Sequence, residues 1–170
     1  MVRLKEERVK HTVLTIGTSN LGLDAFIGNL QAHNVKALVD VRSKPFSRLF
    51  WFNQDALAKA VAACGIEYLY GGRILGGQAN YKAQDPLFVL KMDRIVDLAL
   101  FNERPAMMCA EGDPADCHRA GKLTRWLHVN RPDLATQHIL RSGELVDGRL
   151  YEPKIKPAHR DLTMGDWPVA

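Results

Sequence analysis

The sequence predicts an α/β fold, a single domain with a mainly parallel five-stranded sheet and helices on both faces. Short apolar runs alternate along the chain with segments whose apolar residues recur at helical spacing. The strand-like runs are almost continuously apolar, which is typical of strands covered on both faces. Asp85-Pro86 and Asp113-Pro114 each pair an N-cap aspartate with a proline at the first helical position. The strand order, Rossmann-like or flavodoxin-like, stays open.

These patterns place each element in order along the chain. The predicted strands are His11–Ile16, Ala37–Val41, Ile66–Tyr70, Ala106–Ala110 and Thr136–Leu140. The predicted helices include the apolar positions of Leu23–Leu30, Leu57–Cys64, Phe88–Ala99 and Pro114–His128. Asn53, Asp85 and Asp113 are the expected N-caps. Cys64 is expected in the core, because a free cysteine on an apolar helix face behaves as a small hydrophobe.

Length and composition limit the possible classes of protein. The 170 residues suit one domain, with a charged lead at 1–10, a core at about 12–140 and a segment at 145–170 that wraps the surface. The net charge of +4 permits a phosphate-bearing partner without implying a dedicated nucleic-acid coat. Three cysteines and no apolar signal segment predict a cytoplasmic protein without a disulfide scaffold. We expect no membrane partner, and the oligomeric state stays open.

Polar residues follow the predicted strands, where the carboxyl ends of parallel strands open to one edge of the sheet. The candidate ligand-binding residues are Gly17, Thr18, Ser19, Asn20, Arg42, Ser47, Arg48, Tyr70, Gly76, Gly77 and Arg119. Arginine forks, hydroxyls and helix N–H groups suit an anion with several oxygens. We therefore predict a phosphate-containing ligand, with Arg42, Arg48 and Arg119 as anion clamps.

The run Cys109–Arg119 carries two thiols, three carboxylates, an imidazole and a guanidinium. Helix capping accounts for two of the carboxylates, Asp113 and Asp116. The candidate catalytic residues are His118, Glu111, Cys117, Cys109 and Asp40. His118 is the expected acid/base, oriented by Glu111 or Asp40, although Asp40 is equally explained by a structural ion pair. Cys117 is a conditional nucleophile, since a thiol near a helix N-terminus and an arginine is favoured as the thiolate.

The cysteine spacing predicts no metal ligand set. Cys109 and Cys117 are too far apart for a Cys-x-x-Cys pair, and no second pair completes a four-ligand site. A site built from these cysteines and His118 is conceivable, beside the alternative of two buried structural thiols. The cofactor is therefore left unknown.

Four ordered motifs identify a family resemblance. They are Thr15–Ser19, Asp40–Arg42 with Pro45, Ser47 and Arg48, Gly65–Tyr68 with Leu75–Gly77, and Cys109–Glu111 with Cys117–Arg119. Together they resemble the bacterial domain-of-unknown-function 488 family. The resemblance implies a cytosolic α/β domain with its signature residues in strand-end loops, and no reaction. It also implies histidine in many relatives at the position of Thr18, which leaves His118 as the one histidine in the predicted site loops.

Three hypotheses of function follow from these residues, and whether the protein is an enzyme stays open. The first is an enzyme-like domain that binds a phosphate-containing ligand, a nucleotide or nucleic acid, in a strand-end cleft. The second is a non-catalytic nucleic-acid-binding module in which Phe46, Phe50, Trp51 and Tyr70 stack on bases. The third is thiol or metal chemistry at Cys109, Cys117 and His118.

Overall fold

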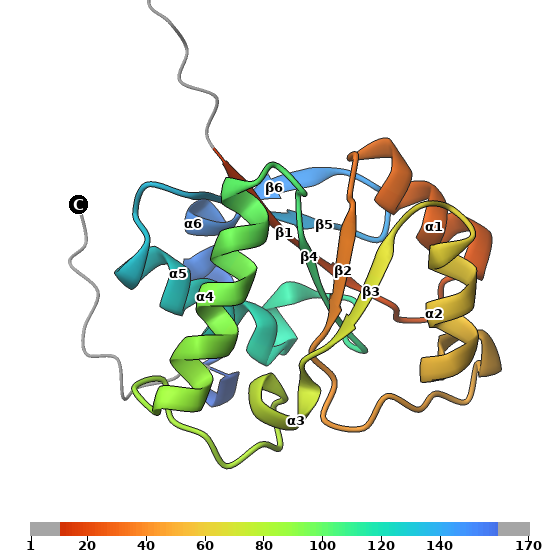
Figure 1. The fold of residues 1–170 in the computed structure, drawn as a ribbon. Helices are drawn as coiled ribbons and strands as arrows, with labels where there is room; N and C mark the ends of the chain where they lie inside the picture. The colour runs from red at the N-terminus through yellow and green to blue at the C-terminus, as the bar shows by residue number, and fades with distance from the viewer. Residues whose placement is uncertain (1–10, 160–170) are drawn as a thin grey trace, which may run out of the picture.

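The computed structural model describes residues 11–159, which form a six-stranded sheet of order β3-β2-β4-β1-β5-β6 (Figure 1). The parallel strands are β1 Thr12–Gly17, β2 Ala37–Asp40, β3 Glu67–Tyr70, β4 Ala106–Cys109 and β5 Ala135–Ile139. The α/β class and the mainly parallel sheet are thus confirmed. The charged lead at 1–10 and the end of the C-terminal segment, 160–170, lie outside the described residues.

The sheet has one strand more than the sequence predicts. β6, Leu145–Asp147, pairs antiparallel with β5 through a tight turn in which Gly143 adopts a φ of 87°. It lies in the segment expected only to wrap the surface. The strand is three residues long and none of them is buried, so it carries no apolar run by which the sequence could reveal it.

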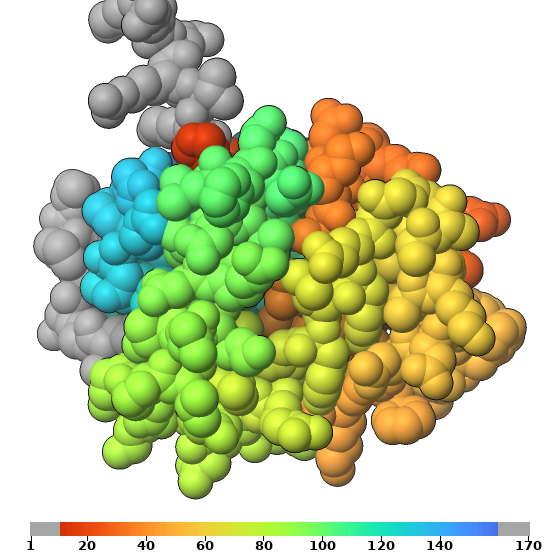
Figure 2. Space-filling model, in the orientation of Figure 1, coloured from red at the N-terminus to blue at the C-terminus, as the bar shows by residue number. Residues whose placement is uncertain are grey.

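Two layers of helices enclose the sheet. The longer helices are α1 Leu23–Ala32, α2 Gln54–Ala62, α4 Pro86–Leu100 and α5 Arg125–Asn130. The short ones are α3 Gly72–Leu75, α6 Gly148–Tyr151, the 3₁₀ turns η1 Phe50–Phe52, η2 Pro114–Asp116, η4 Glu152–Lys154 and η5 Pro157–His159, and the π-helical turn η3 Arg119–Thr124. Figure 2 shows α4 in green across the near face.

The two faces of the sheet have separate apolar cores. Phe26 and Leu30 of α1 and Leu57 of α2 pack with Leu14 and Ile16 of β1. The core on the opposite face consists of Phe88, Met92 and Ile95 of α4, of Leu123, Trp126 and Leu127, and of the strand residues Val13, Val39, Met107 and Cys109. Neighbouring strand residues point to opposite faces, which is why the strand sequences are continuously apolar.

The predicted helix Pro114–His128 is interrupted. Asp113 caps its start as expected, since its carboxylate accepts a 2.8 Å hydrogen bond from the backbone N–H of Ala115. The first turn ends at Asp116, however, and Cys117 has an extended backbone with φ −135° and ψ 140°. A π-helical turn follows before α5 begins. Such turns are rare and often accompany functional sites.

The N-cap positions are confirmed, and the predicted burial of Cys64 is wrong. Asn53 and Asp85 are the N-cap residues of α2 and α4, but their side chains accept from the backbone N–H groups of Ser47 and Lys82 and make no cap bond. Cys64 is exposed rather than buried, because α2 ends at Ala62 and the chain turns away at Gly65, whose φ is 74°.

The topology creates a crevice between β2 and β4. The chain leaves β2 through α2 toward β3, and leaves β4 through η3 and α5 toward β5, in opposite directions and on opposite faces. In open α/β sheets, ligand sites lie outside the carboxyl ends of strands at such a switch point. Within residues 11–159, we find no helix with the length and apolar character needed to span a membrane.

A buried polar chain crosses the second core. Arg119 Nε donates to Thr15 Oγ1 at 3.3 Å, and Thr15 Oγ1 lies 2.8 Å from His138 Nδ1. This hydrogen bond joins the Thr15 hydroxyl to the buried imidazole ring of His138. Burial, followed by the charge of Arg119, lowers the pKa of His138 from 6.5 to about 3.

We predict that acid destabilises the protein through His138. Between pH 6.5 and 3 the unfolded state binds a proton there that the folded state does not, so the free energy of unfolding falls as pH falls, by up to about 1.4 kcal/mol per pH unit. Urea unfolding from pH 7.5 to 5 should show a shallower pH slope for His138→Leu than for the wild type. Equal slopes would contradict this assignment.

Candidate functional site

A cleft of about 760 Å³ opens at the carboxyl ends of β2 and β4. We call it the strand-end cleft. It is lined by Arg42, Ser43, Lys44, Phe46, Gly77, Gln78, Cys109, Ala110, Glu111, Asp116, Cys117, His118, Lys122, Ala158 and His159. The first four residues follow β2, Gly77 and Gln78 follow β3 and α3, the residues from Cys109 to Lys122 come from the end of β4 and the segment after it, and the last two come from η5.

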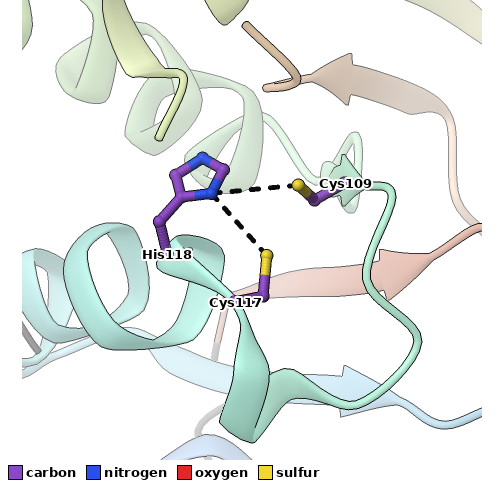
Figure 3. A group of neighbouring side chains, drawn as sticks. All are labelled: Cys109, Cys117 and His118. Atoms are coloured by element: carbon purple, nitrogen blue, oxygen red, sulfur yellow. Dashed lines mark hydrogen bonds between the residues drawn. The ribbon is translucent and has the colours of Figure 1, made fainter. Parts of the chain in front are cut away.

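Three chemically reactive side chains meet in this cleft (Figure 3). Cys109 ends β4, Cys117 lies in the extended step after η2, and His118 is the N-cap residue of the π-helical turn. His118 Nδ1 lies 3.8 Å from the sulfur of Cys109 and 3.7 Å from that of Cys117. All three atoms lie within 4.8 Å of one another. We call this group the Cys-Cys-His cluster.

The two buried thiols have opposed proton affinities. A hydrogen bond with Cys109, a hydrogen bond with His118 and the charge of Arg119 together lower the pKa of Cys117. Burial acts in the opposite direction but is outweighed. The hydrogen bond to Cys117, with burial, raises the pKa of Cys109. The contact between the two thiols thus shifts their pKa values in opposite directions, and the shift favours the thiolate at Cys117 over Cys109.

Arg119 holds the loop that carries the cluster. Its side chain is fully buried, and its two terminal nitrogens donate to the backbone carbonyls of Glu111 at 2.5 Å and Gly112 at 3.0 Å. With the bond to Thr15, the guanidinium joins this loop to β1. Its donors thus bind the protein's own carbonyls, so we assign Arg119 to positioning the loop and not to clamping an anion.

The end of β1 also holds the loop after β4 in place. The backbone N–H groups of Thr18 and Ser19 donate to the carbonyls of Cys109 and Ala110, both at 2.9 Å. A Cβ at Gly17 would lie 1.9 Å from the carbonyl oxygen of Glu111, so only glycine permits this approach. The predicted binding loop after β1 therefore forms a platform for the cluster.

The loop after β2 is fixed by a buried ion pair. Asp40 accepts from Arg42 Nε at 2.9 Å and Nη2 at 2.6 Å, and from the hydroxyl of Tyr68 at 2.6 Å. Burial and the hydrogen bond to Asp40 raise the pKa of Tyr68. Because Asp40 is fully buried and accepts several bonds, the geometry favours the structural reading of this carboxylate.

The loop after β3 covers the histidine of the cluster. Tyr70 donates to the carbonyl of Ser43 at 3.0 Å, and the Ser43 hydroxyl accepts from the N–H of Gln78 at 2.9 Å. Gly77 lies against the His118 ring: a Cβ there would be 3.1 Å from Nδ1. Glycine at this position lets the loop pack on the imidazole.

The fold brings together only part of the predicted site. The candidates that line the strand-end cleft are Arg42, Gly77, Cys109, Glu111, Cys117 and His118. Those that do not line it are Gly17, Thr18, Ser19, Asn20, Asp40, Ser47, Arg48, Tyr70, Gly76 and Arg119. Most of the second group support the lining residues through the contacts described above.

Several lining residues were not among the candidates. Ser43 and Lys44 follow Arg42 directly, so the loop itself was the available signal. Lys122 lies four residues after His118, a spacing that places two side chains on one side of a helix. His159 comes from η5, and nothing in its sequence context points to the cleft.

Comparison with known proteins supports the family resemblance. The model described as "Domain of unknown function DUF488" matches residues 22–126. The chain belongs to the DUF488 family. No curated protein and no solved structure matches it. The DUF488 match includes the Cys-Cys-His cluster and Arg119, whereas Thr15, Gly17 and His138 lie outside the matched range.

We predict that Arg119→Ala destabilises the protein by about 3 kcal/mol or more. The substitution leaves the Glu111 and Gly112 carbonyls without their donor and opens a cavity beside Thr15. Urea unfolding measures the effect. Arg48→Ala, which removes an exposed arginine outside the cleft lining, is the control and should stay within about 0.5 kcal/mol of the wild type. Equal stability of the two variants would refute the positioning role.

Proposed function

We propose that this DUF488 protein is an enzyme that acts on a phosphate-containing substrate, a nucleotide, in the strand-end cleft. One observation carries the proposal: the Cys-Cys-His cluster, whose groups transfer protons or attack electrophiles, lines a cleft at the switch point of the sheet. An apolar core needs no such group, and reactive residues are concentrated at sites of this kind.

The charges around the cleft suit an anionic ligand. Lys44 and Lys122 line it together with two carboxylates, Glu111 and Asp116, whereas the charge of Arg42 is paired with Asp40. Lys156 pairs with Asp116, which offsets that negative charge. Lys122 donates to the Tyr81 carbonyl at 2.5 Å and lies 4.9 Å from the centre of the Phe88 ring, so its ammonium is held in position. A preorganised cation favours binding of a phosphate group.

An exposed aromatic ring favours a nucleotide over a simpler phosphate. Phe46 lines the cleft although 78% of its surface is exposed. Its exposed face can stack on a base. Lys44, two residues earlier, is also exposed and lines the same cleft, which adds a cation to the β2 side of the lining.

The cluster supplies the reactive groups for this proposal. Cys117 is the candidate nucleophile, and His118 is the candidate acid/base because its Nδ1 faces both sulfurs. Glu111 lines the cleft but is exposed, and its backbone carbonyl, not its carboxylate, is held by Arg119. We therefore assign the chemistry to the cluster and not to Glu111 or Asp40.

We predict that Lys44→Ala weakens binding of adenosine 5′-monophosphate and ribose 5-phosphate alike, by about three- to tenfold, because each loses one charged contact. Phe46→Ala should weaken only the nucleotide, by about tenfold, since only the base can stack. Calorimetric titration checks both effects. Arg48→Ala is the matched control on the same loop and should bind as the wild type does.

Two results would contradict the proposal. The first is binding of neither probe, with or without divalent metal ions. The second is binding of oligonucleotides alone, with a steep dependence on salt and no effect of Lys44→Ala or His118→Ala, which would favour the non-catalytic nucleic-acid-binding module. If a nucleotide binds, mass spectrometry should detect a product with the wild type and none with Cys117→Ala.

A further inference from the structure

The Cys-Cys-His cluster has the dimensions of a transition-metal site. In tetrahedral zinc sites the Zn–S and Zn–N bonds are about 2.3 and 2.0–2.1 Å, which places a sulfur and a nitrogen ligand about 3.6 Å apart. The two sulfurs of the cluster lie 3.8 and 3.7 Å from His118 Nδ1. The third distance, between the sulfurs, is within 4.8 Å, against about 3.8 Å for ideal geometry. We propose that Cys109, Cys117 and His118 bind a zinc ion.

The local fold holds the three ligands in this arrangement. Cys109 is fixed by the sheet, as the last residue of β4. Cys117 is turned toward it by the extended step between η2 and the π-helical turn, and the following residue, His118, then faces both sulfurs. Arg119 anchors the intervening loop to β1. A helix that continued unbroken through Cys117 would not have this extended step. The interruption is therefore what directs the Cys117 thiol toward Cys109.

Charge and ligand type also favour this ion. Two thiolates and a neutral imidazole balance the charge of Zn²⁺, and sulfur with imidazole nitrogen is the donor set that zinc accepts. Cysteine ligates zinc as the thiolate, so metal binding should release protons from the ligand thiols.

The donor count indicates a catalytic rather than a structural site. Three protein ligands leave one position of a tetrahedral ion for water or a substrate oxygen, and two cysteines with one histidine is a known catalytic set. All three ligands line the strand-end cleft. A zinc ion held there would supply a Lewis acid for a phosphate oxygen and would lower the pKa of a bound water to about 7.

One detail predicts moderate affinity. A metal-bound histidine usually donates its second ring N–H to an acceptor, which orients the ring. Within residues 11–159, His118 Nε2 is buried and has no hydrogen-bond partner. Packing against Gly77 orients the ring in its place. We therefore expect the site to release zinc to a strong chelator.

The first experiment uses the full chain, purified without chelator and without a histidine tag. We expect about one zinc per chain by elemental analysis. After removal by chelator, cobalt(II) should produce an intense thiolate-to-metal charge-transfer band with the visible absorption of tetrahedral cobalt. Zinc should protect Cys109 and Cys117 from alkylation, mapped by mass spectrometry, and leave the exposed Cys64 reactive. Absence of both zinc and the cobalt spectrum would overturn the proposal.

The second experiment assigns the ligands. Cys109→Ala, Cys117→Ala and His118→Ala should each weaken zinc binding by more than about 100-fold, and Cys64→Ala should not change it. Circular dichroism checks that each variant folds. If a variant does not fold, the cobalt spectrum of the wild type still tests whether thiolates bind the metal. Undiminished affinity in the three variants would overturn the ligand assignment.

A substitution outside the ligands tests the geometry. Gly77→Ala places a methyl group 3.1 Å from His118 Nδ1, so the ring must move. We predict a zinc affinity about 10- to 100-fold lower, with one zinc still bound at saturation. Gly28→Ala is the matched control, because a Cβ at this exposed α1 position meets nothing within 4 Å. Equal zinc affinities for the two variants would show that His118 does not ligate.

As zinc ligands, Cys117 and His118 would hold the ion and would not act as nucleophile and acid/base, so the zinc proposal changes their roles but not the proposed substrate. It can fail or succeed separately from the proposed function. It is measured without any substrate, and it concerns the ion and not the nucleotide. Zinc binding without nucleotide binding would leave the metal site established and the substrate assignment refuted. Nucleotide turnover by zinc-free protein in chelator would refute the catalytic role of zinc and support Cys117 as the nucleophile.

Discussion

The site depends on one interaction, the buried fork of Arg119. A charged guanidinium in an apolar core is costly unless its donors are satisfied, and here they reach two loop carbonyls and the Thr15 hydroxyl. The fork ties the loop after β4 to the end of β1. The cluster cysteines stand at the two ends of that loop, so the distance between their sulfurs depends on this buried charge.

A second buried charge does the same for the facing loop. Asp40 and Arg42 pair at the end of β2, and Tyr68 completes the bonds of the carboxylate. Removing one member of such a pair leaves a charge uncompensated, which makes both residues structural even where Arg42 also lines the cleft. The buried charged residues Asp40, Arg42 and Arg119 thus hold the loops of the cleft in place. The thiols and the imidazole of the cluster are the groups proposed to react.

The proposed substrate and the proposed ion occupy one continuous site. Phe46 and Lys44 lie on the β2 side of the strand-end cleft, and the Cys-Cys-His cluster lies on the β4 side. A nucleotide that fills the cleft would therefore lie between Phe46 and Lys44 on one side and the cluster on the other. The switch in topology between β2 and β4 is what separates these two sides.

The sequence by itself determined the α/β class, the five parallel strands, the cap at Asp113 and the loops that carry the polar residues, because periodicity and helix-start chemistry are local. Only the tertiary structure decided what those loops do. Nothing local distinguishes Arg119, buried among carbonyls, from Lys44, exposed at the cleft. The spacing of Cys109 and Cys117 predicted no metal site, since ligand geometry depends on distance in space. An extended residue, a π-helical turn and a buried arginine set that distance, and none of the three has a periodic signature.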